Sequence, residues 1–148
     1  METQFVKVQS NKDIIISVLL IILGSILIAT PVGASLNVVG GMLFFTGLIM
    51  VFVLKSNYKN LDDGMKYAKK ELYFVNGVKD TLLAAMKSAP ESIEVNAKAN
   101  GNTLRLDVYY NKAANKAYMQ LFEYVPYRYE VCSDMMEYDI AQVEKLIK

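Results

Sequence analysis

The residues best suited to binding a ligand are tyrosines and arginines in the C-terminal half of the chain. Arg105 and Tyr109 lie four positions apart in an alternating segment, so they would share one face of a strand. Tyr127, Arg128 and Tyr129 follow one another further along. A guanidinium beside flat phenol rings can stack a base and pair with a phosphate. We therefore predict a ligand-binding surface from these five residues. The alternative is that tyrosines fill strand positions, for which their propensity is high.

The composition offers little for catalysis. The 148 residues contain no His and one Cys, Cys132, so no histidine can act as an acid, a base or a zinc ligand. No phosphate-binding loop, zinc-protease motif or nucleophile elbow occurs in the sequence. We expect a protein that is not an enzyme and that uses no cofactor and no metal ion.

The segments that carry the tyrosines predict an antiparallel sheet of three or four strands in residues 91–148. Residues 93–97 and 104–109 alternate apolar and polar side chains around Asn100-Gly101, a pair typical of a hairpin turn. Residues 116–124 and 127–132 would add two strands, and Ser133 would cap a final helix over residues 134–148. The predicted order is helix, meander, helix, which is an α+β domain.

The helix before the sheet is predicted within residues 55–90. Apolar side chains recur there at spacings of three and four, the period of a packed helix. They are Leu61, Met65, Ala68, Leu72 and Val75. The pair Asn76-Gly77 is expected to divide this helix.

Residues 14–54 contain no Asp, Glu, Lys or Arg. The apolar segments 14–30 and 36–54 would span about 25 Å and about 28 Å as helices, enough for each to cross a bilayer. We predict a transmembrane helical hairpin that turns at residues 31–35. The alternative is a signal peptide with the cleavage pattern Val32-Gly33-Ala34, against which the second apolar segment directly downstream argues.

Lysines on both sides of the hairpin predict its orientation. Lys7 and Lys12 precede the first span, and the connection between the spans holds no Lys or Arg. Five lysines follow the second span and are expected to lie at the membrane surface near anionic lipid: Lys55, Lys59, Lys66, Lys69 and Lys70. The positive-inside rule then places residues 1–13 and the C-terminal domain in the cytoplasm, at the bacterial inner membrane.

Small residues return to similar faces of the two spans. They are Ser17, Gly24, Gly40, Gly41 and Gly47. Such residues let helices approach closely in lipid. They would pack the hairpin against itself or, as the second possibility, pack protomers together in a homo-oligomer.

The order of elements over residues 62–148 resembles that of double-stranded-RNA-binding domains. Those domains begin their last helix with a lysine cluster that grips phosphates, whereas this chain has SDMMEYD there. Residues 71–148 hold nine basic and eleven acidic side chains, so we predict that the domain does not bind duplex RNA.

In architecture the chain also resembles the small two-span membrane effectors of bacterial anti-phage defence. These include nucleotide-signalled effectors and Hailong-type channel effectors, which a nucleotide product holds closed. The resemblance implies a homo-oligomeric ion channel whose cytoplasmic domain senses a nucleotide, an oligonucleotide or a protein partner. It nominates Arg105, Tyr109 and Arg128 as ligand contacts. The alternative function is a non-catalytic, membrane-anchored scaffold or accessory subunit that docks a larger complex.

Overall fold

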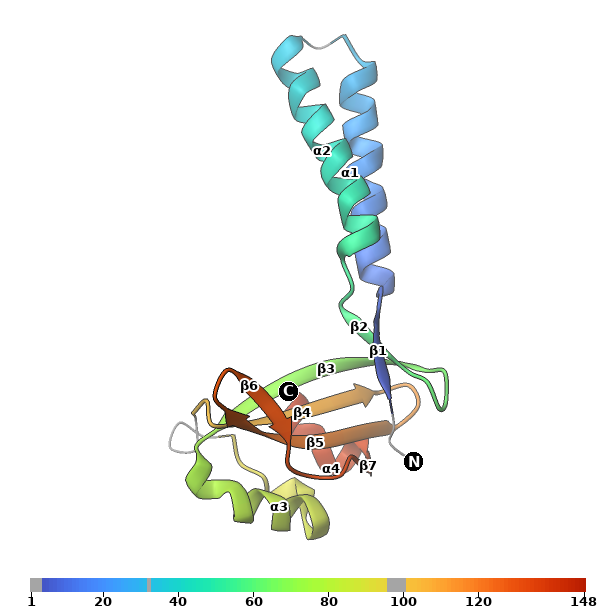
Figure 1. Ribbon diagram of the computed structural model, residues 1–148. Coiled ribbons are helices and arrows are strands. Elements are labelled where there is room, and N and C mark those ends of the chain that lie inside the picture. The colour runs from blue at the N-terminus through green and yellow to red at the C-terminus, as the bar shows by residue number, and fades with distance from the viewer. Residues whose placement is uncertain (1–3, 32, 96–100) are drawn as a thin grey trace. The chain divides into compact units, whose positions relative to one another are not determined.

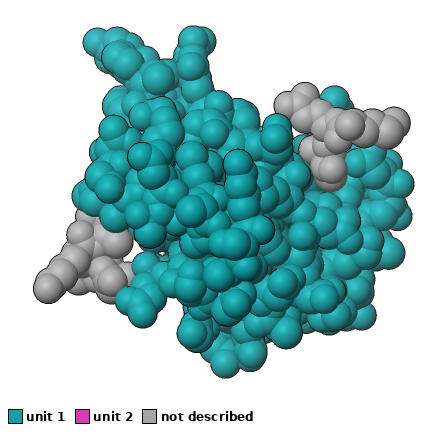
Figure 2. Space-filling model, turned by 90° about the horizontal axis from the view of Figure 1, so that it is seen from below, with its two compact units in different colours: residues 1–5, 58–148 teal, residues 6–57 magenta. Residues whose placement is uncertain are grey.

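The computed structural model describes residues 4–31, 33–95 and 101–148 and divides into two compact units (Figure 1). One unit consists of residues 6–57, and the other of residues 1–5 together with residues 58–148. The surface of this second unit is drawn in teal in Figure 2. The helical unit is thus inserted into the sequence of the sheet unit.

The helical unit contains α1 (Asn11–Ala29) and α2 (Ala34–Val53), both long and apolar enough to cross a membrane. The two predicted apolar segments are therefore helical. Helix α1 begins before the apolar run because Ser10 caps it: the Ser10 hydroxyl accepts from the Asp13 amide at 3.1 Å, and the Asp13 carboxylate accepts from the Ser10 amide at 2.8 Å. Gly33 precedes α2 with φ of 109°, a conformation that glycine adopts without strain.

One carboxylate joins the two ends of the helical unit. The Asp13 carboxylate also accepts hydrogen bonds from Ser56, through its amide at 3.0 Å and its hydroxyl at 2.8 Å. The Gln9 side chain donates to the carbonyl of Val51 nearby. The start of α1 and the chain that leaves α2 are therefore tied together by polar contacts.

The sheet unit is an antiparallel sheet with two helices. Two strands cross the boundary between the units: β1 (Phe5–Val8) and β2 (Asn57–Asn60). The other elements are β3 (Lys66–Phe74), a short 3-10 turn η1 (Asn76–Val78), α3 (Lys79–Ser88), a second turn η2 (Pro90–Ser92), β4 (Leu104–Asn111), β5 (Lys116–Val125), β6 (Arg128–Val131), β7 (Met136–Asp139) and α4 (Ile140–Ile147). The strands lie in the order β1-β2-β3-β4-β5-β6, and β7 also pairs with β5. Strands β1 and β2 border the helical unit in sequence, before α1 and after α2.

The two faces of the sheet differ in chemistry. On one face Leu106, Met119 and Leu121 pack with residues of α3 and α4, which lie on that side of the strands (Figure 1). Alternation then places Arg105, Asp107 and Tyr109 of β4 on the other face. We call this second face the polar face.

Residues 57–60 and 66–74 form strands joined by a turn, so the predicted helix over this region is wrong. Strand β3 pairs with β4 from Ala68↔Tyr110 to Phe74↔Leu104. Leu72 and Phe74 enter the core while Tyr67 and Lys69 occupy the polar face. A strand that buries both faces can imitate a helical period. Helix α3 begins only at Lys79 and lies between β3 and β4 rather than before the sheet.

The predicted hairpin around Asn100-Gly101 differs from the observed pairing, because β4 pairs with β3 and β5. Ile93 is buried in the core beside η2, and residues 93–95 are in no strand; residues 96–100 lie outside the described part of the chain. The last helix begins at Ile140 rather than at residue 134. Asp139 caps it, and the Ser133 hydroxyl accepts from the Leu121 amide at 2.8 Å instead.

Candidate functional site

The five predicted ligand residues do not form one surface. Arg105 and Tyr129 lie together at one end of the polar face, whereas Tyr109 is buried at the other end. Tyr127 belongs to the turn between β5 and β6, and Arg128 is the first residue of β6. Three places on the sheet unit therefore need separate description: a charged centre, an open groove and a buried tyrosine cluster.

The charged centre surrounds Asp107, whose side chain is 1% exposed. Lys69 Nζ lies 2.8 Å from Asp107 Oδ2 and 2.6 Å from Glu71 Oε1. Arg105 Nε lies 2.9 Å from Asp107 Oδ1, and Arg105 Nη2 donates to Oδ2 at 3.2 Å. Two cations and two carboxylates thus balance one another, so the centre holds no net charge to attract an anion.

Lys69, which was predicted to lie at the membrane surface, is a member of this centre, and its side chain is only 11% exposed. Burial alone would lower the pKa of Lys69, but its hydrogen bonds to Asp107 and Glu71 raise the pKa overall. The same bond from Lys69, with one from the Tyr73 hydroxyl, lowers the pKa of Glu71. Lys55, Lys59 and Lys66 are exposed, and Lys70 is half-buried in β3.

The open groove lies beside Arg105. Its lining residues are Tyr73, Asn102, Thr103, Tyr124 and Tyr129, around a hollow of about 610 Å³. The Arg105 guanidinium carbon lies 4.6 Å from the ring centre of Phe122 and 4.7 Å from that of Tyr129. Tyr129 also meets Tyr73 at 6.4 Å and Tyr124 at 5.3 Å between ring centres, both edge-on. We call these residues the tyrosine groove.

Hydrogen bonds fix the rings of the groove. The Tyr129 hydroxyl donates to the Asn102 carbonyl at 2.7 Å, and the Tyr73 hydroxyl donates to Glu71 at 2.7 Å. The bond to Glu71 raises the pKa of Tyr73. The groove therefore presents oriented, neutral aromatic walls.

Tyr127 has an unusual backbone beside the groove. Its φ is 72°, a left-handed conformation that bulky residues rarely adopt, and its side chain is 98% exposed. Pro126 and Tyr127 connect Val125 to its partner Arg128, so Tyr127 stands where such a turn favours glycine. The Tyr127 amide donates to the Tyr124 hydroxyl at 3.3 Å. Arg128 forms an ion pair with Glu130.

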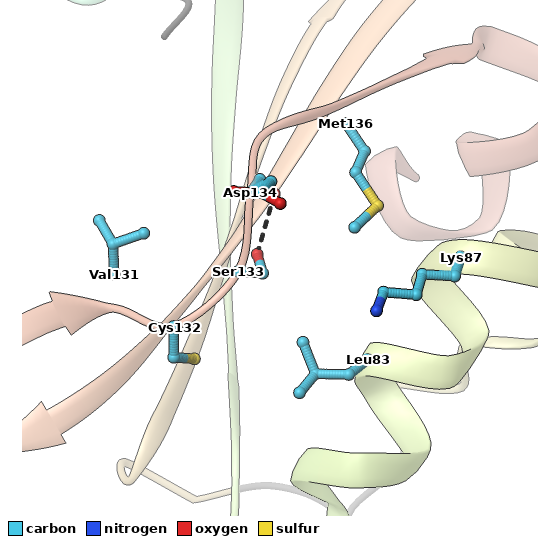
Figure 3. A pocket seen from close by; sticks show the side chains of 7 residues that line it. All are labelled: Leu83, Lys87, Val131, Cys132, Ser133, Asp134 and Met136. Atoms are coloured by element: carbon cyan, nitrogen blue, oxygen red, sulfur yellow. Dashed lines mark hydrogen bonds between the residues drawn. The ribbon is translucent and has the colours of Figure 1, made fainter.

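A second hollow, of about 410 Å³, separates α3 from the segment between β6 and β7 (Figure 3). Leu83 and Lys87 line it from the helix, and the other lining residues are Val131, Cys132, Ser133, Asp134 and Met136. Burial raises the pKa of the Cys132 thiol, which keeps it protonated at neutral pH. This hollow therefore lacks an activated nucleophile.

The buried tyrosine cluster occupies the end of the polar face opposite the groove. Tyr67, Tyr109 and Tyr118 come from the adjacent strands β3, β4 and β5, and each is buried. The ring of Phe5 lies flat on Tyr109, with 4.1 Å between ring centres and 7° between planes. The ring stacked on Tyr109 therefore belongs to the same chain, and contact of Tyr109 with a ligand stays a prediction.

Four of the five small residues in the spans pack α1 against α2 within the helical unit. A Cβ on Gly24 would lie 2.5 Å from the Phe44 amide nitrogen, and one on Gly47 would lie 2.8 Å from the Ser17 carbonyl oxygen. Gly40 is equally close to Leu27, at 2.7 Å. Gly41 instead faces open space. The interpretation that small residues close the hairpin on itself thus accounts for all of them except Gly41.

Sequence reasoning missed Phe5, Tyr67 and Tyr73 as members of these aromatic sites. Phe5 precedes the membrane segment, and Tyr73 fell within the predicted helix. Among the described residues no group of three or more His, Cys, Asp or Glu could hold a metal ion.

Comparison with known proteins gives no relative from which a role could be transferred. The chain matches no protein-family model, no curated protein and no solved structure. A function for this chain must therefore be argued from its own sites.

Proposed function

We propose that the protein is a two-span membrane protein, with both termini in the cytoplasm of a bacterium, whose sheet unit recognises a ligand at the tyrosine groove. The observation that carries this proposal is Tyr127. The left-handed backbone of Tyr127 lowers the stability of the fold by an amount on the order of 1–3 kcal/mol. The Tyr127 ring is 98% exposed, so no buried contact of this ring offsets that loss. A strained, exposed tyrosine beside three further tyrosines supports a recognition surface.

The charges around the groove indicate what kind of ligand fits. Within the part of the chain that the structure describes, Arg105 is paired with Asp107 and Arg128 with Glu130, so both arginines near the groove already have a carboxylate partner. An anion would have to compete with these carboxylates, whereas a flat ring can stack on a tyrosine directly. The groove thus favours a nucleoside or nucleotide bound mainly through its base.

Ligand binding is tested on the full chain in detergent with adenosine and AMP as probes. Loss of a stacking tyrosine typically costs about 1–3 kcal/mol per base, so Tyr129→Ala is expected to weaken adenosine binding at least about fivefold. Lys112→Ala, at an exposed turn position, serves as the control. Equal affinity of the Tyr129→Ala variant and the wild type for both probes would reject the groove as the site. Stronger binding of AMP than of adenosine would show that a cation leaves its carboxylate partner to meet the phosphate.

The proposed output is a change in membrane permeability by a homo-oligomer. It is supported by the architecture: the chain of the sheet unit leads through β1 into α1 and resumes through β2 after α2, so both apolar helices are joined directly to this unit. Reconstituted protein is expected to release ions from liposomes in one ligand condition and to retain them in the other. Absence of flux with and without either probe would remove the channel from the proposal.

A membrane-anchored scaffold is the second candidate, and the glycines favour it. Gly24, Gly40 and Gly47 pack against the facing helix of the hairpin. Of these four glycines, Gly41 is the one with open space around it. The oligomeric mass in detergent separates the candidates. A discrete homo-oligomer supports the channel, and a monomer that copurifies with one protein partner supports the scaffold.

A further inference from the structure

We propose that Tyr67, Tyr109 and Tyr118 form a binding site for a planar aromatic ring, that Phe5 of the same chain fills this site, and that a competing ring displaces Phe5. We call the three residues the tyrosine cage. The cage lies at the other end of the polar face from the tyrosine groove, and its existence does not depend on the function proposed for the groove.

The geometry around Phe5 is that of a bound ring. Tyr109 stacks on one face of it, at 4.1 Å and 7°. Tyr67 and Tyr118 meet the same ring edge-on, at 5.5 Å and 88° and at 5.6 Å and 66°. Aromatic rings prefer stacked and edge-on contacts, and Phe5 makes one stacked contact, with the ring of Tyr109 as the floor of the site, and two edge-on contacts, with Tyr67 and Tyr118 as its walls.

The cage is held together by contacts that do not involve Phe5. Tyr109 and Tyr118 are directly opposite each other on β4 and β5. The Tyr67 hydroxyl donates to Asp63 at 2.6 Å, and the Tyr118 hydroxyl donates to Glu137 at 3.1 Å. The rings of Tyr67 and Tyr118 also meet edge-on at 5.6 Å. The walls therefore keep their positions when the occupant leaves.

Phe5 enters the cage from an edge strand. Strand β1 is the last strand of the sheet on its side, and next to Phe5 the Gln4 carbonyl accepts from the Leu61 amide at 3.0 Å. The neighbouring Val6 is 47% exposed, so the ring of Phe5 supplies the apolar contact at this point. Because α1 begins at Asn11, Phe5 lies six residues before the first residue of the first apolar helix.

The surroundings of the cage define the ligand as a neutral ring. Lys69 Nζ lies 5.5 Å from the centre of the Tyr109 ring, but its charge is balanced by Asp107 and Glu71. The hydroxyls of Tyr67 and Tyr118 already donate to carboxylates, so neither offers its proton to an anionic ligand. A flat, uncharged ring such as a phenol matches these features.

The test uses phenol as the planar probe and cyclohexanol as a non-planar ring of the same size, on the full chain in detergent. Phe5→Ala empties the cage, and Val6→Ala truncates the adjacent exposed side chain as the control. Millimolar phenol is expected to raise the Tm of Phe5→Ala by about 4 °C, as expected for a ligand that binds only the folded state, and to raise the Tm of Val6→Ala less, because there phenol must first displace Phe5. Cyclohexanol is expected to have a smaller effect than phenol. Equal effects of phenol and cyclohexanol, or of phenol on both variants, would overturn the proposal.

A second variant covers the case in which Phe5→Ala does not fold. The chain contains no Trp, so Phe5→Trp and Val6→Trp each introduce a single fluorescent reporter. Acrylamide is expected to quench Trp at position 5 several-fold less than Trp at position 6, and phenol is expected to reduce this difference while cyclohexanol leaves it. If phenol leaves the protection of position 5 unchanged, Phe5 is a fixed core residue and the cage is no ligand site.

Discussion

The Phe5 ring lies parallel to the Tyr109 ring, with 4.1 Å between their centres, and this contact attaches the start of β1 to the middle of the sheet. Tyr109→Leu removes the floor of the cage, and we expect it to increase hydrogen exchange at the Leu61 amide, which bonds to Gln4, by about tenfold. Tyr73→Leu, at the other end of the polar face, is the control. Unchanged exchange at Leu61 in the Tyr109 variant would show that the strand is held without the stack.

Asp107 is expected to be the most sensitive charged residue of the sheet unit. Asp107→Ala leaves the half-buried side chains of Lys69 and Arg105 without the carboxylate that they share. Removing one partner of a buried ion pair typically lowers the unfolding free energy by about 3–5 kcal/mol. Glu130→Ala breaks the exposed ion pair with Arg128, for which we expect a cost below about 1 kcal/mol. Denaturant unfolding in detergent measures both. A loss for Asp107→Ala as small as that for Glu130→Ala would contradict the structure.

Stability is expected to fall above about pH 10. Burial raises the pKa of Tyr67 well above its ordinary value of 10.0, and the hydrogen bond to Asp63 raises it further; burial also raises the pKa of Tyr109 and of Tyr118. Above pH 10 the unfolded chain releases these protons while the folded chain retains them. The unfolded state is therefore favoured as the pH rises, by about 1.4 kcal/mol per pH unit for each such tyrosine.

Tm measured from pH 9 to pH 11.5 tests this expectation. Tyr67→Phe cannot ionise, so its Tm should decline less steeply than that of the wild type, whereas Tyr127→Phe, which alters an exposed ring, should decline equally. Identical slopes for the two variants would mean that the cage tyrosines ionise as freely in the folded protein as in the unfolded chain.

The glycines of the helical unit predict a contrast between two alanine variants. Gly24→Ala places a methyl group 2.5 Å from backbone of α2, so the helices must separate and we expect a loss of about 1–3 kcal/mol. Gly41→Ala meets nothing within 4 Å, and higher helix propensity should make it neutral or stabilising by up to about 1 kcal/mol. Resistance to unfolding in SDS distinguishes them. A stabilised Gly24→Ala would mean that the two helices pack through other residues.

Tyr127→Gly separates stability from recognition. Removing the strained tyrosine should stabilise the β5–β6 turn by about 1 kcal/mol while weakening binding at the tyrosine groove. Asn115→Gly, at a second residue with positive φ (53°), should change stability less, because Asn tolerates this conformation. Thermal unfolding and adenosine titration of the same samples provide the two readouts. A destabilised Tyr127→Gly would show that the exposed ring serves the fold.

The segments that were predicted correctly are those in which a single physical property determines the residue pattern. The two apolar helices follow from uninterrupted hydrophobicity, and β5 follows from alternation between Tyr118 and Gln120 on one face and Met119 and Leu121 on the other. Strand β3 was misassigned because its side chains do not alternate cleanly in polarity: Tyr67 is buried on the polar face, and Lys70 lies on the same face as Leu72 and Phe74.

The ligand surface was only partly predictable for a related reason. A four-residue spacing correctly places Arg105 and Tyr109 on the same face, but it does not reveal that Asp107 lies between them and neutralises Arg105. Nor does local pattern show that Phe5 covers Tyr109, since this contact joins residues more than a hundred positions apart. Contacts of such sequence separation depend on the topology of the sheet, which the chain's local preferences leave undetermined.

The division of the chain has a practical consequence for the sheet unit. Phe5 and Tyr58, the residues on either side of the inserted segment 6–57, both contact the ring of Tyr109, at 4.1 Å and 5.2 Å. If segment 6–57 were removed, the two chain ends left at Phe5 and Tyr58 would therefore contact the same side chain. A short glycine–serine bridge from Phe5 to Tyr58 should yield a water-soluble domain that retains both aromatic sites, which makes ligand screening accessible without detergent.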